Sequence, residues 1–402
     1  MSRTDNTSAT STLSEIRRTA SLLTSSGMFA RSPSSEARDF VQQDALLHYE
    51  IGGPIGRGAS GEVFDAVLHF SGGKTFHCAA KKIPMKKMGP AQFDCVENEL
   101  HKRLTDSLSS SIESGLLNWV AMIEVDSPAK SNAGKSCYLF MTKCSVVLKD
   151  CIAELATLRE IDHKKWSSIV FCLLKSMVNM LASLKARNAY HGDLKPQNMG
   201  LCINPEGVEK MGWAAFDFGT LVFSDEQPVD DTLARLKGTP PYIAPEVCAG
   251  VGESSINRDM WALGQILGKL LGEPVLFCAA NDTACIFSAG QAYEHERRAS
   301  MVRKQDVLSV QADSQAALER EIRRTTDFHT CIALLKLKMC QILPENRPTA
   351  ATLEFAVRHL SRFVSSEHQR INEEYFSSES SSHVASPPRA TADETDSRSC
   401  SL

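Results

Sequence analysis

The spacing of apolar residues changes along the chain and predicts two structurally different halves. An alternation of apolar and polar positions begins near Tyr49 and returns over residues 63–70, which are rich in β-branched and aromatic residues, so we expect strands there. Tyr138 to Met141 form a short apolar run typical of a buried strand. From Trp166 to Arg187 the apolar residues follow helical spacing, which predicts a long buried helix.

Further helices are predicted on either side of this core. Residues 93–104 carry apolar side chains at helical spacing, and residues 328–343 and 350–363 are expected to form closing helices. Residues 273–326 fit the pattern less well. Their stretch from Ser314 to Arg324 places acids and bases as a solvent-exposed helix does. We therefore expect a solvated insert, with a docking insert as the alternative.

Both ends of the chain are rich in serine and contain few aromatic residues. Residues 1–45 and 364–402 are therefore expected to be disordered tails, because such sequences bury too little apolar surface to fold. A folded domain is expected between them, over residues 46–363.

Composition and net charge indicate which kinds of partner and which cell compartment to expect. The chain has 402 residues, of which 43% are hydrophobic, and a net charge of −4, so nothing favours nucleic acid or an anionic membrane as a partner. We expect neither a secretory leader nor a membrane span, since no uninterrupted apolar run reaches ~18 residues. The 13 cysteines form no Cys-x-x-Cys pair, which predicts reduced thiols and a cytoplasmic location, with the nucleus not excluded. The oligomeric state stays open.

A glycine-rich stretch follows the first predicted strand. Gly56, Gly58 and Gly61 have the spacing of loops whose backbone amides approach phosphates. In a dinucleotide-binding domain such a loop opens a helix, whereas here Val63, Phe64 and the residues after them predict a second strand. A hairpin over phosphates is therefore favoured, and a glycine-rich hairpin without a ligand is the alternative.

Charged and amide side chains gather in two later stretches. The segment from Tyr190 to Asn198 contains Asp193, Lys195 and Asn198, and Asp217 follows some twenty residues on. An isolated Asp or Asn is usually a turn or cap residue. Two carboxylates and one amide that converge would instead suit Mg²⁺, which prefers oxygen ligands.

Taken in order, these motifs resemble those of protein kinases of the Ser/Thr type. The resemblance covers roughly residues 48–363 and includes Cys78-Ala79-Ala80-Lys81, Asp217-Phe218-Gly219 and the segment from Gly238 to Glu246. It implies an α+β, bilobal fold, with a small β-rich N-lobe over 46–143 and a larger α-helical C-lobe over 144–363.

The resemblance also implies roles for single residues. Asp193 would accept the proton of the attacking hydroxyl, and Lys195 would steady the transferred phosphoryl group. Lys81 would reach the α- and β-phosphates of ATP and pair with Glu97, with Glu99 as the alternative. Asn198 and Asp217 would bind Mg²⁺. Contacts to ATP are expected from Ile55, Gly56, Gly58, Gly61, Val63, Ala79, Lys81, Met141, Thr142, Cys144, Asn198 and Asp217.

The same resemblance predicts supporting contacts around the segment from Tyr190 to Asn198, which corresponds to the catalytic loop of protein kinases. Thr239 would hydrogen-bond Asp193 and Lys195, a placement typical of Ser/Thr kinases. Glu246 would pair with Arg347, and Asp259 would brace the backbone of the catalytic loop.

Three residues depart from the family pattern. His101 stands where an apolar residue usually packs behind Phe218. Gly192 replaces an arginine that usually binds a phosphate on the activation loop, so we expect activity that does not depend on loop phosphorylation. Gly200 lacks the aliphatic side chain under the adenine, and we expect either that Met199 or Leu201 fills that place or that the nucleotide binds less tightly.

The expected function is ATP- and Mg²⁺-dependent phosphoryl transfer to a Ser or Thr hydroxyl of a protein substrate. A pseudokinase scaffold is the first alternative, although Lys81, Asp193 and Asp217 are all present. A small-molecule kinase is the second, because His-Gly-Asp also occurs in aminoglycoside and choline kinases. Lys195-Pro196 and the segment from Gly238 argue against it.

Overall fold

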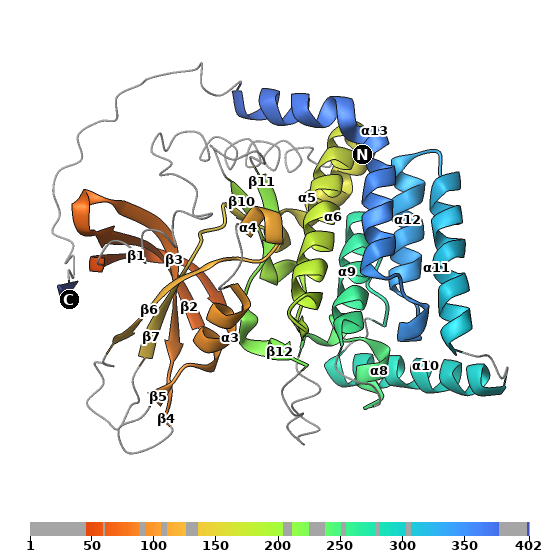
Figure 1. Ribbon diagram of the computed structural model, residues 1–402, viewed down its shortest axis with the longest axis horizontal. Coiled ribbons are helices and arrows are strands. Elements are labelled where there is room, and N and C mark those ends of the chain that lie inside the picture. The colour runs from red at the N-terminus through yellow and green to blue at the C-terminus, as the bar shows by residue number, and fades with distance from the viewer. Residues whose placement is uncertain are drawn as a thin grey trace, which may run out of the picture.

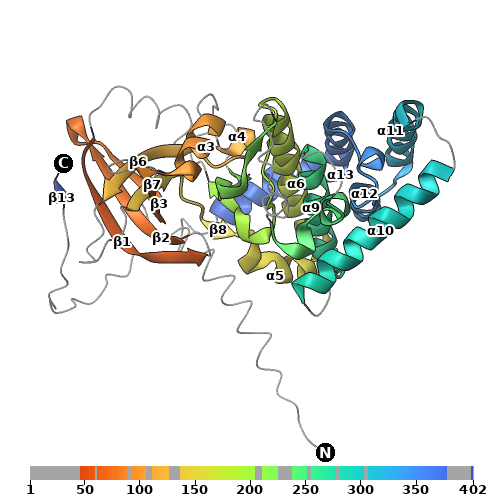
Figure 2. The same ribbon diagram turned by 90° about the horizontal axis from the view of Figure 1, so that it is seen from below.

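The computed structural model describes most of the chain and has two lobes. A β-sheet forms one end and helices form the other (Figure 1 and Figure 2), which confirms the predicted α+β, bilobal fold. The predicted tail over residues 1–45 lies outside the described residues. The described ranges are 46–58, 61–87, 93–105, 111–125, 136–203, 211–224, 238–250, 255–277, 281–302, 307–377 and 400–401.

The N-lobe is built on one antiparallel sheet in which most neighbours along the chain are also neighbours in space. Strict alternation along its strands turns one set of apolar side chains inward, including Tyr49, Leu68 and Phe140. The order across the sheet is β13 (Cys400–Ser401), β1 (Leu46–Gly58), β2 (Gly61–Phe70), β3 (Thr75–Pro84), β7 (Ser136–Met141) and β6 (Trp119–Val125).

Short elements complete this lobe. Helix α3 (Val96–Thr105) lies beside the sheet and begins with two acidic residues in its first turn. The others are η1 (Ser71–Gly73), β4 (Lys86–Lys87), β5 (Phe93–Asp94) and α4 (Ser111–Ser114).

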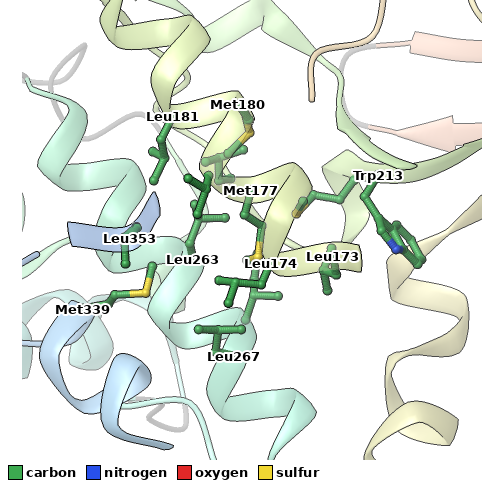
Figure 3. Close-up of a cluster of buried hydrophobic side chains, with 14 of the residues drawn as sticks. Leu173, Leu174, Met177, Met180, Leu181, Trp213, Leu263, Leu267, Met339 and Leu353 are labelled. Atoms are coloured by element: carbon green, nitrogen blue, oxygen red, sulfur yellow. The ribbon is translucent and has the colours of Figure 1, made fainter. Parts of the chain in front are cut away.

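The C-lobe packs around helix α6 (His163–Lys185), whose N-terminus is capped by the side chain of Asp162. Figure 3 shows α6 side chains meeting residues from β11, α9, α12 and α13 in one buried cluster. The other helices are α5 (Leu148–Ile161), α8 (Pro245–Cys248), α9 (Ile256–Leu270), α10 (Asp282–Val302), α11 (Val307–Arg324), α12 (Phe328–Met339) and α13 (Ala350–Ser377).

Helix α6 is unusually long and apolar. Residues His163–Ala186 are long enough to cross a membrane, and an 18-residue stretch within them has a mean hydropathy of 1.6, yet 72% of that stretch is buried inside the lobe. Burial against neighbouring helices accounts for this apolar character.

Small strands and single turns at the boundary between the lobes hold the loops that carry the polar motifs. The strands are β8 (Val146–Val147), β9 (Ala189–Tyr190), β10 (Met199–Ile203), β11 (Met211–Ala215) and β12 (Val222–Phe223), and the turns are η2 (Pro196–Asn198), η3 (Phe218–Thr220), η4 (Pro240–Tyr242) and, farther away, η5 (Pro344–Asn346).

Two expectations are corrected here. The insert is not simply solvated, because α10 and α11 each bury side chains against the lobe: Cys285, Ala289, Tyr293, Leu318 and Ile322. The predicted C-terminal tail also starts too early, since α13 continues to Ser377.

Candidate active site

Lys81 is the centre of the candidate site. The register of β3 turns Lys81 into the protein, where only 5% of it is exposed, while Lys82 is partly exposed. Its Nζ donates hydrogen bonds to Glu97 Oε1 at 2.6 Å, to Glu97 Oε2 at 2.8 Å and to Asp217 Oδ1 at 2.7 Å. Burial would lower the pKa of Lys81, but the two carboxylates outweigh it and raise the pKa. Lys81 therefore stays cationic.

The two carboxylates come from different lobes. Glu97 lies in the first turn of α3, and it is Glu97 rather than Glu99 that contacts Lys81; Glu99 is exposed. Asp217 has a left-handed backbone, with φ 66° and ψ 68°. A non-glycine residue in this region carries local strain, which accumulates at functional sites. The structure thus holds Asp217 in an unusual conformation that faces Lys81.

A second polar group surrounds Asp193. The hydroxyl of Thr239 donates to Asp193 Oδ1 at 2.8 Å, and Lys195 Nζ donates to Asp193 Oδ2 at 2.6 Å. Lys195 also donates to Thr239 Oγ1 at 2.6 Å. The catalytic loop and the segment before η4 are therefore joined through three side chains, as the sequence predicted for Thr239.

Asn198 completes this group. Its Nδ2 donates to the carbonyl of Asp193 at 2.9 Å, and the residue is 4% exposed. This bond leaves the amide oxygen of Asn198 to act as a ligand, and the carboxylate of Asp217 supplies further oxygens. A carboxylate and an amide oxygen suit Mg²⁺, so the donor set fits the cation that the sequence predicted.

The catalytic loop is braced from beneath by a buried carboxylate. Asp259, fully buried at the start of α9, accepts hydrogen bonds from the amides of His191 at 2.7 Å and Gly192 at 3.0 Å. Burial raises the pKa of Asp259, and His191 and these amides oppose the rise. His191 Nε2 in turn lies 3.0 Å from the carbonyl of Phe216, which ties the catalytic loop to the segment before Asp217.

Gly192, the second departure from the family pattern, is explained by its backbone conformation. Its φ is 82°, and a Cβ there would lie 2.9 Å from the carbonyl oxygen of Thr220. A Cβ on Gly238, with φ 132°, would in turn lie 2.9 Å from the carbonyl oxygen of Gly192. Three chain segments therefore meet backbone to backbone, and an arginine at position 192 would be strained.

His101, the first departure, behaves as a neutral packing residue. It is 1% exposed, its ring lies 4.6 Å from that of Phe218, and its Nε2 lies 2.6 Å from the carbonyl oxygen of Leu117. Burial lowers the pKa of His101 to about 4. An uncharged imidazole that donates to Leu117 thus takes the place of an apolar side chain.

Gly200, the third departure, faces side chains from two other segments. Met199 is buried in the large C-lobe cluster and Leu201 packs against it. A Cβ at Gly200 would instead overlap the Cys144 side chain, approaching its Cβ to 2.6 Å, and would lie 3.1 Å from the ring of Phe216. Cys144 and Phe216 occupy this space, and the missing side chain at 200 was the only sequence signal for them.

The remaining predicted nucleotide contacts lie on the N-lobe strands and the segment joining the lobes. Ala79 and Met141 are buried in one cluster, against which Val63 packs. Ile55 is 49% exposed beside the glycines. The Thr142 amide already donates to the carbonyl of Asn118 at 3.1 Å, so adenine would have to pair with other backbone groups of this segment.

Among the described residues, the glycines of this loop are surrounded by open space except at Gly61. A Cβ at Gly58 would meet nothing within 4 Å, and one at Gly56 would meet only Val63, at 3.8 Å. Gly61, with φ 148°, has no such room, because a Cβ would overlap the carbonyl oxygen of Lys82. The strand pair therefore requires glycine at 61 for steric reasons, whereas at 56 and 58 the protein leaves space for a ligand.

A buried ion pair closes the C-lobe beneath this region. Arg347 binds Glu246 through two parallel hydrogen bonds, each 2.7 Å long, and Arg347 is 1% exposed. The guanidinium also donates to the carbonyls of Gln341, Asn257 and Ile342. This pair, which the sequence predicted, fixes the segment after η4 to the end of the domain.

Comparison with known proteins places the chain among the kinases. The protein kinase domain family matches residues 49–357. The chain is 33% identical over 124 residues to CBL-interacting serine/threonine-protein kinase 9 of Arabidopsis thaliana, covering 31% of this chain and 25% of that protein. It is 41% identical over 113 residues to Serine/threonine-protein kinase GRIK1 of Arabidopsis thaliana, covering 27% and 26%.

A longer match reaches a third relative. The chain is 28% identical over 241 residues to Extracellular signal-regulated kinase 2 of Dictyostelium discoideum, which covers 59% of this chain and 58% of that protein. The chain thus spans less than two thirds of the length of each of these relatives. The family match extends over most of the chain and includes both groups of polar side chains, and this protein belongs to the protein kinase domain family.

Proposed function

We propose that this protein transfers the γ-phosphoryl group of Mg-ATP to a Ser or Thr hydroxyl of a protein substrate. The observation that supports this most is the pairing of Lys81 with Glu97 and Asp217 across the two lobes. The Asp193–Lys195–Thr239 group stands on the C-lobe side. Family membership and the names of the relatives point the same way.

The roles follow from the chemistry of phosphoryl transfer. Bound Mg-ATP would supply the transferable group, with the cation neutralising charge on the phosphates. Asn198 and Asp217 would hold the cation through their side-chain oxygens. Lys81 is kept cationic by its two carboxylates and would orient the phosphate tail.

Asp193 would receive the proton of the attacking hydroxyl. In the same step the hydroxyl oxygen would bond to the γ-phosphorus, and the bond between the γ-phosphorus and the β-phosphate oxygen would break. Lys195 and Thr239 fix both oxygens of Asp193 before a substrate arrives. Catalysis of this kind rests mainly on positioning and electrostatic stabilisation. Thr239 in this place is the feature that favours Ser and Thr acceptors over Tyr.

A transfer assay with a matched control tests the proposal. The full chain is incubated with labelled Mg-ATP and a Ser/Thr peptide library, beside Lys81→Met, Asp193→Asn and Lys82→Met. We expect the first two variants to lose activity by a factor of ~10²–10⁴. Lys82→Met should keep it, because Lys82 is partly exposed.

Two results would contradict the proposal. Equal, negligible transfer by the wild type and both variants, with ATP still bound, would indicate a pseudokinase scaffold. Transfer to an amine or alcohol metabolite without any peptide turnover would indicate a small-molecule kinase.

A further inference from the structure

A histidine–glutamate–histidine cluster lies on the N-lobe, at the end of the β1–β2 hairpin away from the glycine loop. The register pairs His48 with His69, and Glu50 stands two residues along β1 from His48. Alternation puts these three side chains on one face. The residues between them, Tyr49 and Leu68, are buried on the other face. The cluster therefore belongs to the outer face of the sheet.

The ligand atoms of the cluster already converge. His69 Nε2 lies 3.1 Å and His48 Nε2 lies 4.0 Å from Glu50 Oε1. One ligand atom from each residue falls within 4.8 Å of the other two. The two imidazole rings stack, with centroids 4.0 Å apart and an angle of 11° between their planes. Backbone pairing alone brings together three good metal ligands.

Among the described residues, one buried nitrogen atom of the cluster has no hydrogen-bond partner. His69 Nε2 is buried and, among the described residues, makes no hydrogen bond. Glu50 Oε1, 3.1 Å away, is within ion-pair distance of this nitrogen but does not form a hydrogen bond with it. A buried polar nitrogen without a partner is unfavourable. A metal ion between the imidazole and the carboxylate would satisfy it.

We propose that His48, Glu50 and His69 form a zinc site with three protein ligands and a water in the fourth position. Two imidazoles and one carboxylate are a donor set that Zn²⁺ accepts. Ligands at ~2.0–2.2 Å from a tetrahedral ion lie about 3.3 Å from one another, so the present separations need to close by less than about 2 Å. The site is independent of phosphoryl transfer.

Binding requires one change in the side chains. The lone pair of each imidazole lies in the plane of its ring, so two stacked rings cannot both point at the same ion. One ring turns about its Cβ–Cγ bond, a torsion with a broad energy profile. His48 has the freedom to do so, because 40% of its side chain is exposed, against 23% for His69.

The donor set also determines which ions compete. Mg²⁺ prefers oxygen ligands in octahedral geometry, and this cluster offers mainly nitrogen. The magnesium that kinases use with ATP therefore does not displace zinc here. Other divalent metals that accept imidazole, such as Co²⁺, serve as probes of the same ligands.

A zinc titration of the full chain tests the site, with His77→Ala as a matched control. His77 is an exposed histidine on the adjacent strand β3, opposite Val67, and is not part of the cluster of ligand atoms. Isothermal titration calorimetry should give one zinc per chain, unchanged by millimolar Mg²⁺. His48→Ala, His69→Ala and Glu50→Gln should each weaken binding at least tenfold, and His77→Ala less than twofold.

Two further measurements separate this site from the thiols. Zinc should raise the unfolding temperature of the wild type but not of the His48→Ala/His69→Ala variant, whose fold is checked by circular dichroism without metal. The Co²⁺ complex should lack a thiolate charge-transfer band. Unchanged affinity in the ligand variants, a thiolate band, or no binding would each overturn the proposal, the first two indicating an adventitious ion only.

Discussion

At the scale of the residue, His101 shows how a titratable side chain can serve as a packing group. Its ring contacts Phe218, and its Nε2 lies within hydrogen-bond distance of the Leu117 carbonyl oxygen. Burial favours the neutral ring and lowers its pKa from 6.5 to about 4, although the hydrogen bond to Leu117 opposes this shift. The stability of the lobe boundary therefore depends on the protonation of one imidazole.

The expected pH dependence follows from this lowered pKa. Below pH 6.5 the unfolded chain binds a proton at His101 that the folded chain rejects until about pH 4. The contribution to stability is thus fully present above pH 6.5 and is lost as the pH falls towards 4. At pH 5 the loss is about 2 kcal/mol.

Urea unfolding of the wild type and His101→Leu at pH 7 and pH 5 measures the pH-dependent contribution of His101 to the free energy of unfolding. Carboxylates titrate in both proteins, so the quantity of interest is the difference between the two falls in stability. The wild type should lose about 2 kcal/mol more than His101→Leu. An equal loss in both proteins would show that His101 does not control the pH response.

The close packing around Gly200 predicts that a larger residue there destabilises the protein. A methyl group there would overlap Cys144, so Gly200→Ala should cost about 1–3 kcal/mol in the free energy of unfolding and weaken ATP binding. Cys144→Gly should rescue Gly200→Ala, whereas Cys144→Ala should not, because the clash includes the Cβ of Cys144 at 2.6 Å. Thermal unfolding and nucleotide titration are the measurements. A stable single variant would mean that the backbone yields instead.

At the scale of the element, the two insert helices are part of the C-lobe. Helix α10 lies against α8, and a Cβ on Gly290 would come within 3.1 Å of the Cys248 carbonyl oxygen. Helix α11 supplies Gln315, which accepts from the amide of Thr349 and donates to the carbonyl of Arg347. It thereby satisfies backbone groups at the start of α13, where no intrahelical partner exists.

A substitution of Leu318 tests how much the packing of α11 against the lobe contributes to stability. Its side chain is 3% exposed, so Leu318→Ala should lower the free energy of unfolding by about 2–5 kcal/mol. The exposed neighbour Arg320 is the control, and Arg320→Ala should change it by less than about 0.5 kcal/mol. Both follow from urea unfolding monitored by circular dichroism. A neutral Leu318→Ala would mean that α11 contributes little to the folded lobe.

Sequence patterns located some elements better than others for a physical reason. The strands and α6 have a continuous apolar face, which periodicity detects directly. Helix α10 buries Cys285, Ala289 and Tyr293, which recur every four residues but include a thiol, a methyl group and a phenol. The buried side of α10 is therefore only slightly more hydrophobic than its exposed side, and the sequence looks like that of a solvated helix. The four-residue spacing was nevertheless visible.

At the scale of the whole molecule, contacts between distant segments hold the candidate site together. Local motifs allowed Asp193, Lys195 and Asn198 to be predicted, because they lie within one loop. The packing of Cys144 and Phe216 on Gly200 depends on how two strands meet the segment between the lobes, which no local pattern encodes. Their positions needed the structure.

The Glu246–Arg347 pair provides a test at this scale. Arg347→Met leaves a buried carboxylate without a partner and should cost about 3–5 kcal/mol in the free energy of unfolding. Adding Glu246→Leu removes that charge and should recover part of the loss. Urea unfolding of both variants decides between two explanations. If the double variant recovers nothing, the carbonyl contacts of Arg347 stabilise the lobe rather than the ion pair.

The apolar character of α6 has a consequence for how the chain is made. Its partners α9 and α13 lie later in the sequence, so during synthesis an apolar helix emerges well before the surfaces that cover it. Until then it offers chaperones and lipid bilayers a binding surface. A shortened chain that stopped before Ala350 would leave exposed the part of the α6 surface that α13 covers and should aggregate, so α13 completes the burial of α6.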